Sequence, residues 1–147
     1  MASDKLPTLL LRIPAMTVPA IPATTYDKIG GDAVVGKLCD RFYELMDTMP
    51  QFAELRAMHP ADLEGSRDKL YMFLSGWLGG PDLFVEKFGH PRLRARHSPF
   101  AIGTRERDQW VACMALAMDE VGIEEGVRAK LLENFFNTAD FMRNKQD

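Results

Sequence analysis

The sequence predicts an all-α protein. Apolar residues recur at spacings of three and four through several long segments, and no alternating period-two pattern persists over more than a few residues. Glycine and proline clusters separate these segments, which leaves loops short enough for compact antiparallel packing of the helices. At 147 residues the chain is long enough for one domain with a substantial core.

The first 25 residues differ from the rest. Four prolines interrupt an apolar but aperiodic run: Pro7, Pro14, Pro19 and Pro22. We expect residues 1–25 to form an irregular N-terminal extension and residues 26–147 to form the domain. Arg12 and Pro14 break the apolar run before it reaches the length of a signal peptide, and no stretch approaches the ~20 apolar residues that span a bilayer. We therefore expect a cytoplasmic protein with no membrane partner.

The net charge, the cysteines and the absence of common motifs argue against several classes of protein. A net charge of −3 argues against non-specific binding to nucleic acid. Cys39 and Cys113 lie on apolar faces of predicted helices, which favours free, buried thiols over a disulfide. Phosphate-loop, dinucleotide-binding, zinc-protease and hydrolase motifs do not occur in the sequence.

The first long helix is predicted between Gly30-Gly31 and Pro50, with Asp32 as its N-cap. Its apolar face is formed by Val35, Leu38, Cys39, Phe42, Leu45, Met46 and Met49. Tyr43 follows Cys39 by four residues, so it should point inward, where a buried hydroxyl needs a partner. The simpler alternative is a tyrosine that reaches the rim of the core.

Two further helices are predicted before residue 81. Residues 52–58 make about two turns, which His59-Pro60 ends. The next helix opens at Asp62-Leu63 and ends at Gly79-Gly80-Pro81. Its apolar stripe consists of Leu63, Leu70, Phe73, Leu74, Trp77 and Leu78, interrupted by Ser66. Ser66 either bonds back to its own helix or lines a polar pocket.

The C-terminal part is predicted to hold a loop and two helices. Residues 81–87 read as a loop or irregular turn, with Phe84 covering apolar surface. A helix follows with Thr104 as its cap, Glu106 in its first turn and Gly122 at its end. The last helix runs to Met142 and is followed by a charged tail.

The segment Gly89–Phe100 carries two of the three histidines and three arginines, with Pro91 suited to a helix start and Pro99 to its end. The short helix that results presents an imidazole beside guanidinium groups. Such a pair suits a ligand with a metal and anionic arms, as haem has in its iron and propionates. The pattern leaves open whether His90 or His97 is the ligand, although a side chain at a helix start, as His90 is, tends to cap. The simpler interpretation is a histidine that caps the helix, beside arginines that face the solvent.

Several motifs in order resemble the truncated haemoglobins, specifically group II, the O-type. They are Tyr26–Gly31, Arg41–Tyr43, Phe73–Pro81, Gly89–Phe100 and Glu106–Trp110, within a match of about residues 26–142. The resemblance implies a shortened globin fold, in which two helices pack across two others around haem. The sequence contains no C-x-x-C-H, so the haem would be held without a covalent bond, as haem b.

The resemblance also assigns residues. His97 aligns with the proximal iron ligand, which leaves His90 as a structural residue. Arg96 matches a propionate contact and Lys69 a second basic contact, while Phe84 stands where the family often has a tyrosine. Tyr43, His59 and Trp110 align with the polar distal pocket, and Ser66 with its entrance. The apolar wall would comprise Leu70, Phe73, Leu74, Trp77, Leu93, Phe100, Ile102 and Met114.

These residues imply a haem protein that binds dioxygen and related diatomic ligands beside hydrogen-bond donors. The tautomer of His59 decides whether it donates or accepts. Redox chemistry, such as oxidation of nitric oxide or reaction with peroxide, would need an electron-donating reductase. Two alternatives remain at this point: an oxygen sensor or store without turnover, and a haem-free module that binds an acidic partner through Arg92, Arg94 and Arg96. The sequence leaves the oligomeric state open.

Overall fold

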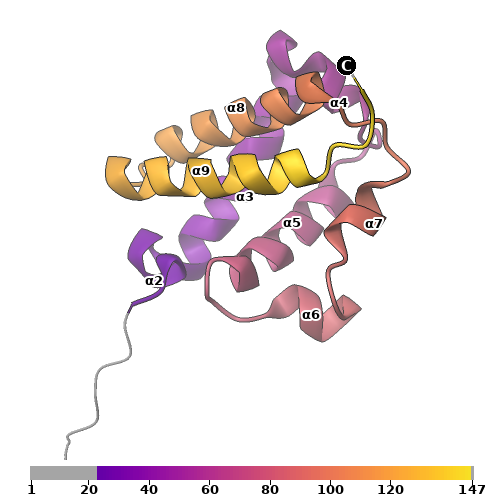
Figure 1. Cartoon of the computed structure of the whole chain (residues 1–147). Coiled ribbons are helices and arrows are strands. Elements are labelled where there is room, and N and C mark those ends of the chain that lie inside the picture. The colour runs from indigo at the N-terminus through magenta and orange to yellow at the C-terminus, as the bar shows by residue number, and fades with distance from the viewer. Residues whose placement is uncertain (1–22, 147) are drawn as a thin grey trace, which may run out of the picture.

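The computed structural model describes residues 23–146, and all regular structure in that range is helical, as predicted (Figure 1). The expected extension lies outside the described residues, apart from Ala23, Thr24 and Thr25. The elements are α2 (Thr25–Ile29), α3 (Gly31–Thr48), η1 (Pro50–Phe52), α4 (Ala53–Ala57), α5 (Glu64–Trp77), α6 (Leu83–Phe88), α7 (Leu93–His97), α8 (Thr104–Glu120) and α9 (Glu125–Phe141).

Two pairs of helices form the body of the molecule. The helices α8 and α9 run antiparallel beside one another, and α3 packs on both α8 and α5 (Figure 1). The core lies where α3 meets α8 and α5. Its fully buried side chains include Val35, Leu38, Cys39, Phe42, Met46, Leu74, Cys113, Met114, Ala117 and Met118. The four long helices thus form the two-over-two arrangement that the resemblance implied.

Both cysteines are free and buried within this core, as expected. Burial raises the pKa of the Cys39 thiol and of the Cys113 thiol to about 12. Both thiols are therefore protonated at neutral pH. No helix in the described range is both long and apolar enough to span a membrane.

The predicted start of the first long helix was wrong. The helix α3 begins at Gly31, and its N-cap is Gly30 with φ 119°, a left-handed conformation that favours glycine. The same glycine ends α2, whose N-cap Thr24 accepts a hydrogen bond from the Asp27 N–H. Asp32 instead accepts a hydrogen bond from the Tyr71 hydroxyl and so ties α3 to α5.

Two other local expectations also need correction. Residues 83–88 form the helix α6 where a loop was expected. Gly103, not Thr104, is the N-cap of α8, and its N–H donates to the Glu106 carboxylate at 2.8 Å. The end of α8 agrees with the prediction, because Gly122 follows it with φ 84°.

Candidate functional site

Tyr43 lies on α3 with its phenol turned into the molecule, only 9% exposed. Its hydroxyl donates to the backbone carbonyl of Ser66 on α5, at 3.3 Å. That distance is long for a bond between a hydroxyl and a carbonyl, so the donor can be redirected at small cost. Burial raises the pKa of Tyr43 well above its usual value, which keeps the phenol protonated and able to donate.

Trp110, on α8, packs against Phe42, which also packs against Tyr43. The ring centroids of Phe42 and Tyr43 are 5.0 Å apart, edge to face, and those of Phe42 and Trp110 are 5.2 Å apart. Among residues 23–146, none accepts a hydrogen bond from the indole N–H of the half-buried Trp110. An indole N–H can only donate, so this group is free for a ligand.

His59 lies after α4 with its ring centroid 5.9 Å from that of Tyr43. Its Nδ1 is 2.9 Å from the Leu55 carbonyl oxygen, which fixes the proton on Nδ1 and leaves the lone pair on Nε2. Burial lowers the pKa of His59, and the neighbouring charges of Arg56 and His97 add to that effect. His59 therefore presents a neutral acceptor at Nε2 and is not a third donor.

The two histidines around α7 have different surroundings. His90 is exposed, and its Nδ1 accepts a hydrogen bond at 3.0 Å from the backbone N–H of Arg92, which has φ 46°. His97 is half-buried at the last turn of α7, with its Nδ1 2.7 Å from the Leu93 carbonyl oxygen. The His97 Nε2 thus keeps a free lone pair, whereas His90 uses a nitrogen to hold the turn.

These groups together suit one kind of occupant. An imidazole with a free Nε2 is a ligand for a transition metal. The apolar side chains near α7 are incompletely covered, since Phe88 is 37% exposed and Phe100 is 43% exposed. A large apolar group that carries a metal fits this combination of donors and apolar surface.

Comparison with protein-family models identifies the family of this chain. The family model described as "Bacterial-like globin" matches residues 24–144. The chain belongs to this globin family. Globins hold haem and bind diatomic ligands such as dioxygen, so haem-based ligand binding follows from the family.

The similar proteins narrow the class to group II truncated haemoglobins. Group 2 truncated hemoglobin YjbI from Bacillus subtilis is 40% identical over 122 residues, which are 83% of this chain and 89% of the relative. The structure of the group II 2-on-2 hemoglobin from Agrobacterium tumefaciens is 48% identical with a TM-score of 0.83, covering 88% of this chain and all of that one (100%). A cold-adapted truncated hemoglobin from Pseudoalteromonas haloplanktis is 43% identical with a TM-score of 0.81, over 84% and 99%.

The basic residues of this truncated globin lie at the surface. The Nε of Arg96 donates to the Pro91 carbonyl at 2.6 Å, and its guanidinium carbon lies 5.0 Å from the ring centroid of Phe84. Lys69 is exposed on α5, the helix across from α7. The phenylalanine at position 84 therefore supports Arg96 through its ring face, in place of a hydroxyl.

The predicted apolar wall divides by burial. Leu74, Ile102 and Met114 are buried, while Leu70, Phe73, Trp77 and Leu93 are half-buried and Phe100 is exposed. Leu74 and Met114 belong to the hydrophobic core. The half-buried and exposed members are partly accessible to solvent.

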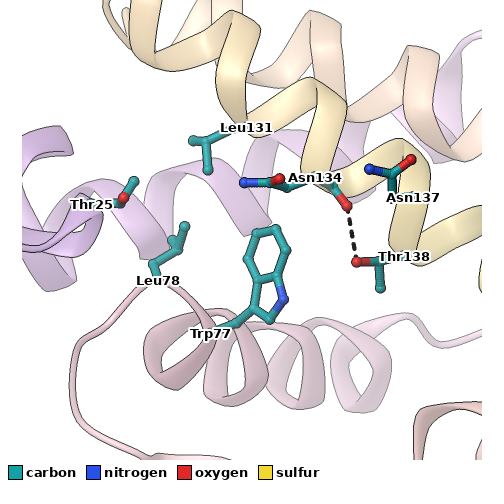
Figure 2. Close-up of a pocket in the computed structure, with 7 residues that line it drawn as sticks. All are labelled: Thr25, Trp77, Leu78, Leu131, Asn134, Asn137 and Thr138. Atoms are coloured by element: carbon teal, nitrogen blue, oxygen red, sulfur yellow. Dashed lines mark hydrogen bonds between the residues drawn. The ribbon is translucent and has the colours of Figure 1, made fainter.

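One cavity of about 400 Å³ lies away from these groups, between α2, α5 and α9 (Figure 2). It is lined by Thr25, Trp77, Leu78, Leu131, Asn134, Asn137 and Thr138. Figure 2 shows the Thr138 hydroxyl donating to the Asn134 carbonyl, at 2.9 Å, and the indole of Trp77 below α9. Trp77 is the only predicted site residue in this lining.

Sequence reasoning missed Asn144, which it placed in a charged tail. The side-chain Nδ2 of Asn144 donates to the Phe100 carbonyl at 2.7 Å and to the His97 carbonyl at 3.3 Å. Its Oδ1 accepts from the Ile102 N–H at 2.9 Å. These partners are more than 40 residues away, so no local pattern signals them.

Proposed function

We propose that this truncated globin holds haem b without a covalent bond, through His97, and binds dioxygen and other diatomic ligands on the side of Tyr43 and Trp110. The observation that carries the proposal is the free indole N–H of Trp110 together with the buried, protonated hydroxyl of Tyr43, two residues whose rings both pack against Phe42. Haem would supply an iron that binds diatomic ligands, and His97 would hold that iron.

The two donors, Trp110 and Tyr43, would stabilise negative charge on a diatomic ligand bound in this site. Trp110 donates without giving up another partner, and Tyr43 gives up only its long bond to the Ser66 carbonyl. His59 accepts at Nε2, so it orients a nearby donor instead of competing for the ligand. With each hydrogen bond contributing about 0.5–1.5 kcal/mol, the two donors would slow release by roughly one to two orders of magnitude.

On the proximal side, the free Nε2 of His97 supports its assignment to the iron, and the charges of Arg96 and Lys69 support contacts with anionic propionates. Arg96 is held by Pro91 and Phe84, so its side chain is ordered at the edge of the site. His90, which caps a turn, has a structural role.

An absorption spectrum gives the first test. Purified protein should show an intense Soret band, and a colourless protein would favour a haem-free module using the α7 arginines. The second test is stopped-flow dioxygen dissociation from the ferrous protein. We expect it to be about tenfold faster in Trp110→Phe and severalfold faster in Tyr43→Phe, because each loses one donor.

Tyr71→Phe is the matched control for these variants. It removes a phenol hydroxyl that bonds Asp32 on the other side of α5, so the dissociation rate should stay at the wild-type value. Unchanged rates in Trp110→Phe and Tyr43→Phe would contradict the donor assignment.

Slow release suits redox use of dioxygen better than delivery. The neutral donors of the site therefore favour reactions such as oxidation of nitric oxide to nitrate, with a reductase supplying electrons, over a store or sensor. The test is to mix the oxygenated protein with nitric oxide in the presence of a reductase system. Sustained turnover supports the redox function, and a single turnover supports the store or sensor.

A further inference from the structure

We propose that Asn144 is a positioning residue for His97: its side-chain amide fixes the loop that follows α7 and so sets the placement of the imidazole. The inference rests on the proposed function, in which His97 coordinates haem iron. It concerns a residue beyond the last helix, in the segment Arg143–Lys145, which we call the C-terminal clasp.

The polar atoms of the Asn144 side chain bond both sides of the loop. The Nδ2 group donates to the carbonyls of Phe100 and His97, at 2.7 and 3.3 Å, while Oδ1 accepts from the N–H of Ile102 at 2.9 Å. The backbone N–H of Asn144 also donates to the Ile102 carbonyl at 2.9 Å. Because two carbonyls need donors and one N–H needs an acceptor, the orientation of the amide is determined.

The helix α7 depends on such contacts because it has little packing of its own. It is five residues long and contains no buried residue. The His97 imidazole bonds Leu93, which lies on the same helix, so this bond orients the ring but does not place α7. Within residues 23–146, every hydrogen bond that joins residues 93–101 to a distant part of the chain involves one of two residues. These residues are Asn144 and Arg143.

The clasp is itself held to the start of α8. Arg143 Nη1 donates to the Thr104 hydroxyl at 3.1 Å, and Lys145 Nζ lies 3.5 Å from the Glu106 carboxylate. Arg143 also pairs with Asp140 at 3.0 Å on the last turns of α9. The C-terminal clasp, which holds the loop after α7, is therefore bound to both α8 and α9.

Three protein samples test the inference: wild type, Asn144→Ala and Asn144→Asp, each with haem bound. Gln146→Ala, at an exposed position two residues on, is the control. The readouts are the iron–histidine stretching band in resonance Raman spectra of the ferrous protein, the rate of haem transfer to an apoglobin acceptor, and amide hydrogen exchange at Ile102.

Asn144→Asp separates positioning from general stability. An aspartate keeps an acceptor for the Ile102 N–H but has no donor for the carbonyls of His97 and Phe100. We expect it to retain the protection of Ile102 while the iron–histidine band shifts or broadens. Asn144→Ala should change the band and also expose Ile102, with haem loss roughly tenfold faster because about three hydrogen bonds of modest net strength are removed.

The outcomes are distinct. A normal iron–histidine band in both Asn144 variants overturns the inference, and so does a band that changes equally in Gln146→Ala. A wild-type protein that gives a haem spectrum but no iron–histidine band overturns the proposed role of His97, and this inference falls with it. A band altered in Asn144→Asp with Ile102 still protected supports positioning by the amide donor.

Discussion

The two faces of the site are built in opposite ways. The face with Tyr43 and Trp110 belongs to α3 and α8, long helices that meet in the core, and Tyr43 is 9% exposed. The face with His97 belongs to a five-residue helix, and Phe100 beside it is 43% exposed. The donor face, which holds Tyr43 and Trp110, is therefore fixed by packing against the core, whereas the face with His97 is placed by a few hydrogen bonds. Changes on the first face should alter ligand kinetics, and changes on the second should alter haem binding.

The largest effect is expected from His97→Ala. It removes the free Nε2 and should abolish normal haem ligation, seen as loss of the iron–histidine band and a changed Soret band. His90→Ala is the matched control, because it removes only the acceptor for the Arg92 N–H on an exposed turn. If His90→Ala lost the band and His97→Ala kept it, the assignment of this helix would be reversed.

A smaller effect, on the donor face alone, is expected from His59→Phe. It removes the Nε2 acceptor but keeps a ring beside Tyr43, so dioxygen dissociation should change by about two- to tenfold with haem retention unaffected. Because the pKa of His59 is lowered, the imidazole is neutral at pH 7 and the wild-type rate should be flat between pH 7 and 8. A rate that followed a histidine titration within that range would show that His59 is charged and donates.

Local pattern predicted the long helices and the inward direction of Tyr43, whereas the grouping of Tyr43, His59 and Trp110 in one site came from the resemblance to a family. Periodicity places Phe42 and Tyr43 on the inner side of α3, and Pro60 and Pro99 end helices through their own backbone geometry. Choosing His97 over His90 required the resemblance to a family. The structure adds a physical reason, since the Nδ1 of His90 is already used by the Arg92 N–H.

What the sequence could not predict depends on contacts between distant residues. Asn144 donates a hydrogen bond to the carbonyl of His97, which lies 47 residues earlier in the sequence. A polar residue in a charged tail carries no periodic signal of such a contact. The N-cap of α3 was misassigned because the left-handed Gly30 serves two helices, a feature that only the turn between them reveals. The tautomer of His59 likewise depends on the Leu55 carbonyl being within 2.9 Å.

The smallest effect is expected at Glu106, which contacts both the start of α8 and the C-terminal clasp. Burial disfavours the charged form of this carboxylate, but the Gly103 N–H, Arg105 and Lys145 outweigh burial and hold its pKa below the usual value. A lowered pKa means that the carboxylate stabilises the fold fully above the ordinary carboxyl pKa, and that this stability is lost as the pH falls through the lowered pKa. Glu106→Gln should therefore cost about 0.5 kcal/mol in urea unfolding at pH 7, because the glutamine amide keeps an acceptor for the Gly103 N–H but loses the charge that pairs with Arg105 and Lys145. The exposed Glu133→Gln on α9 should cost little at any pH. The difference in the free energy of unfolding between wild type and Glu106→Gln should shrink as the wild-type carboxylate becomes protonated. A difference that stays constant in acid would show that Glu106 acts through packing and not through its charge.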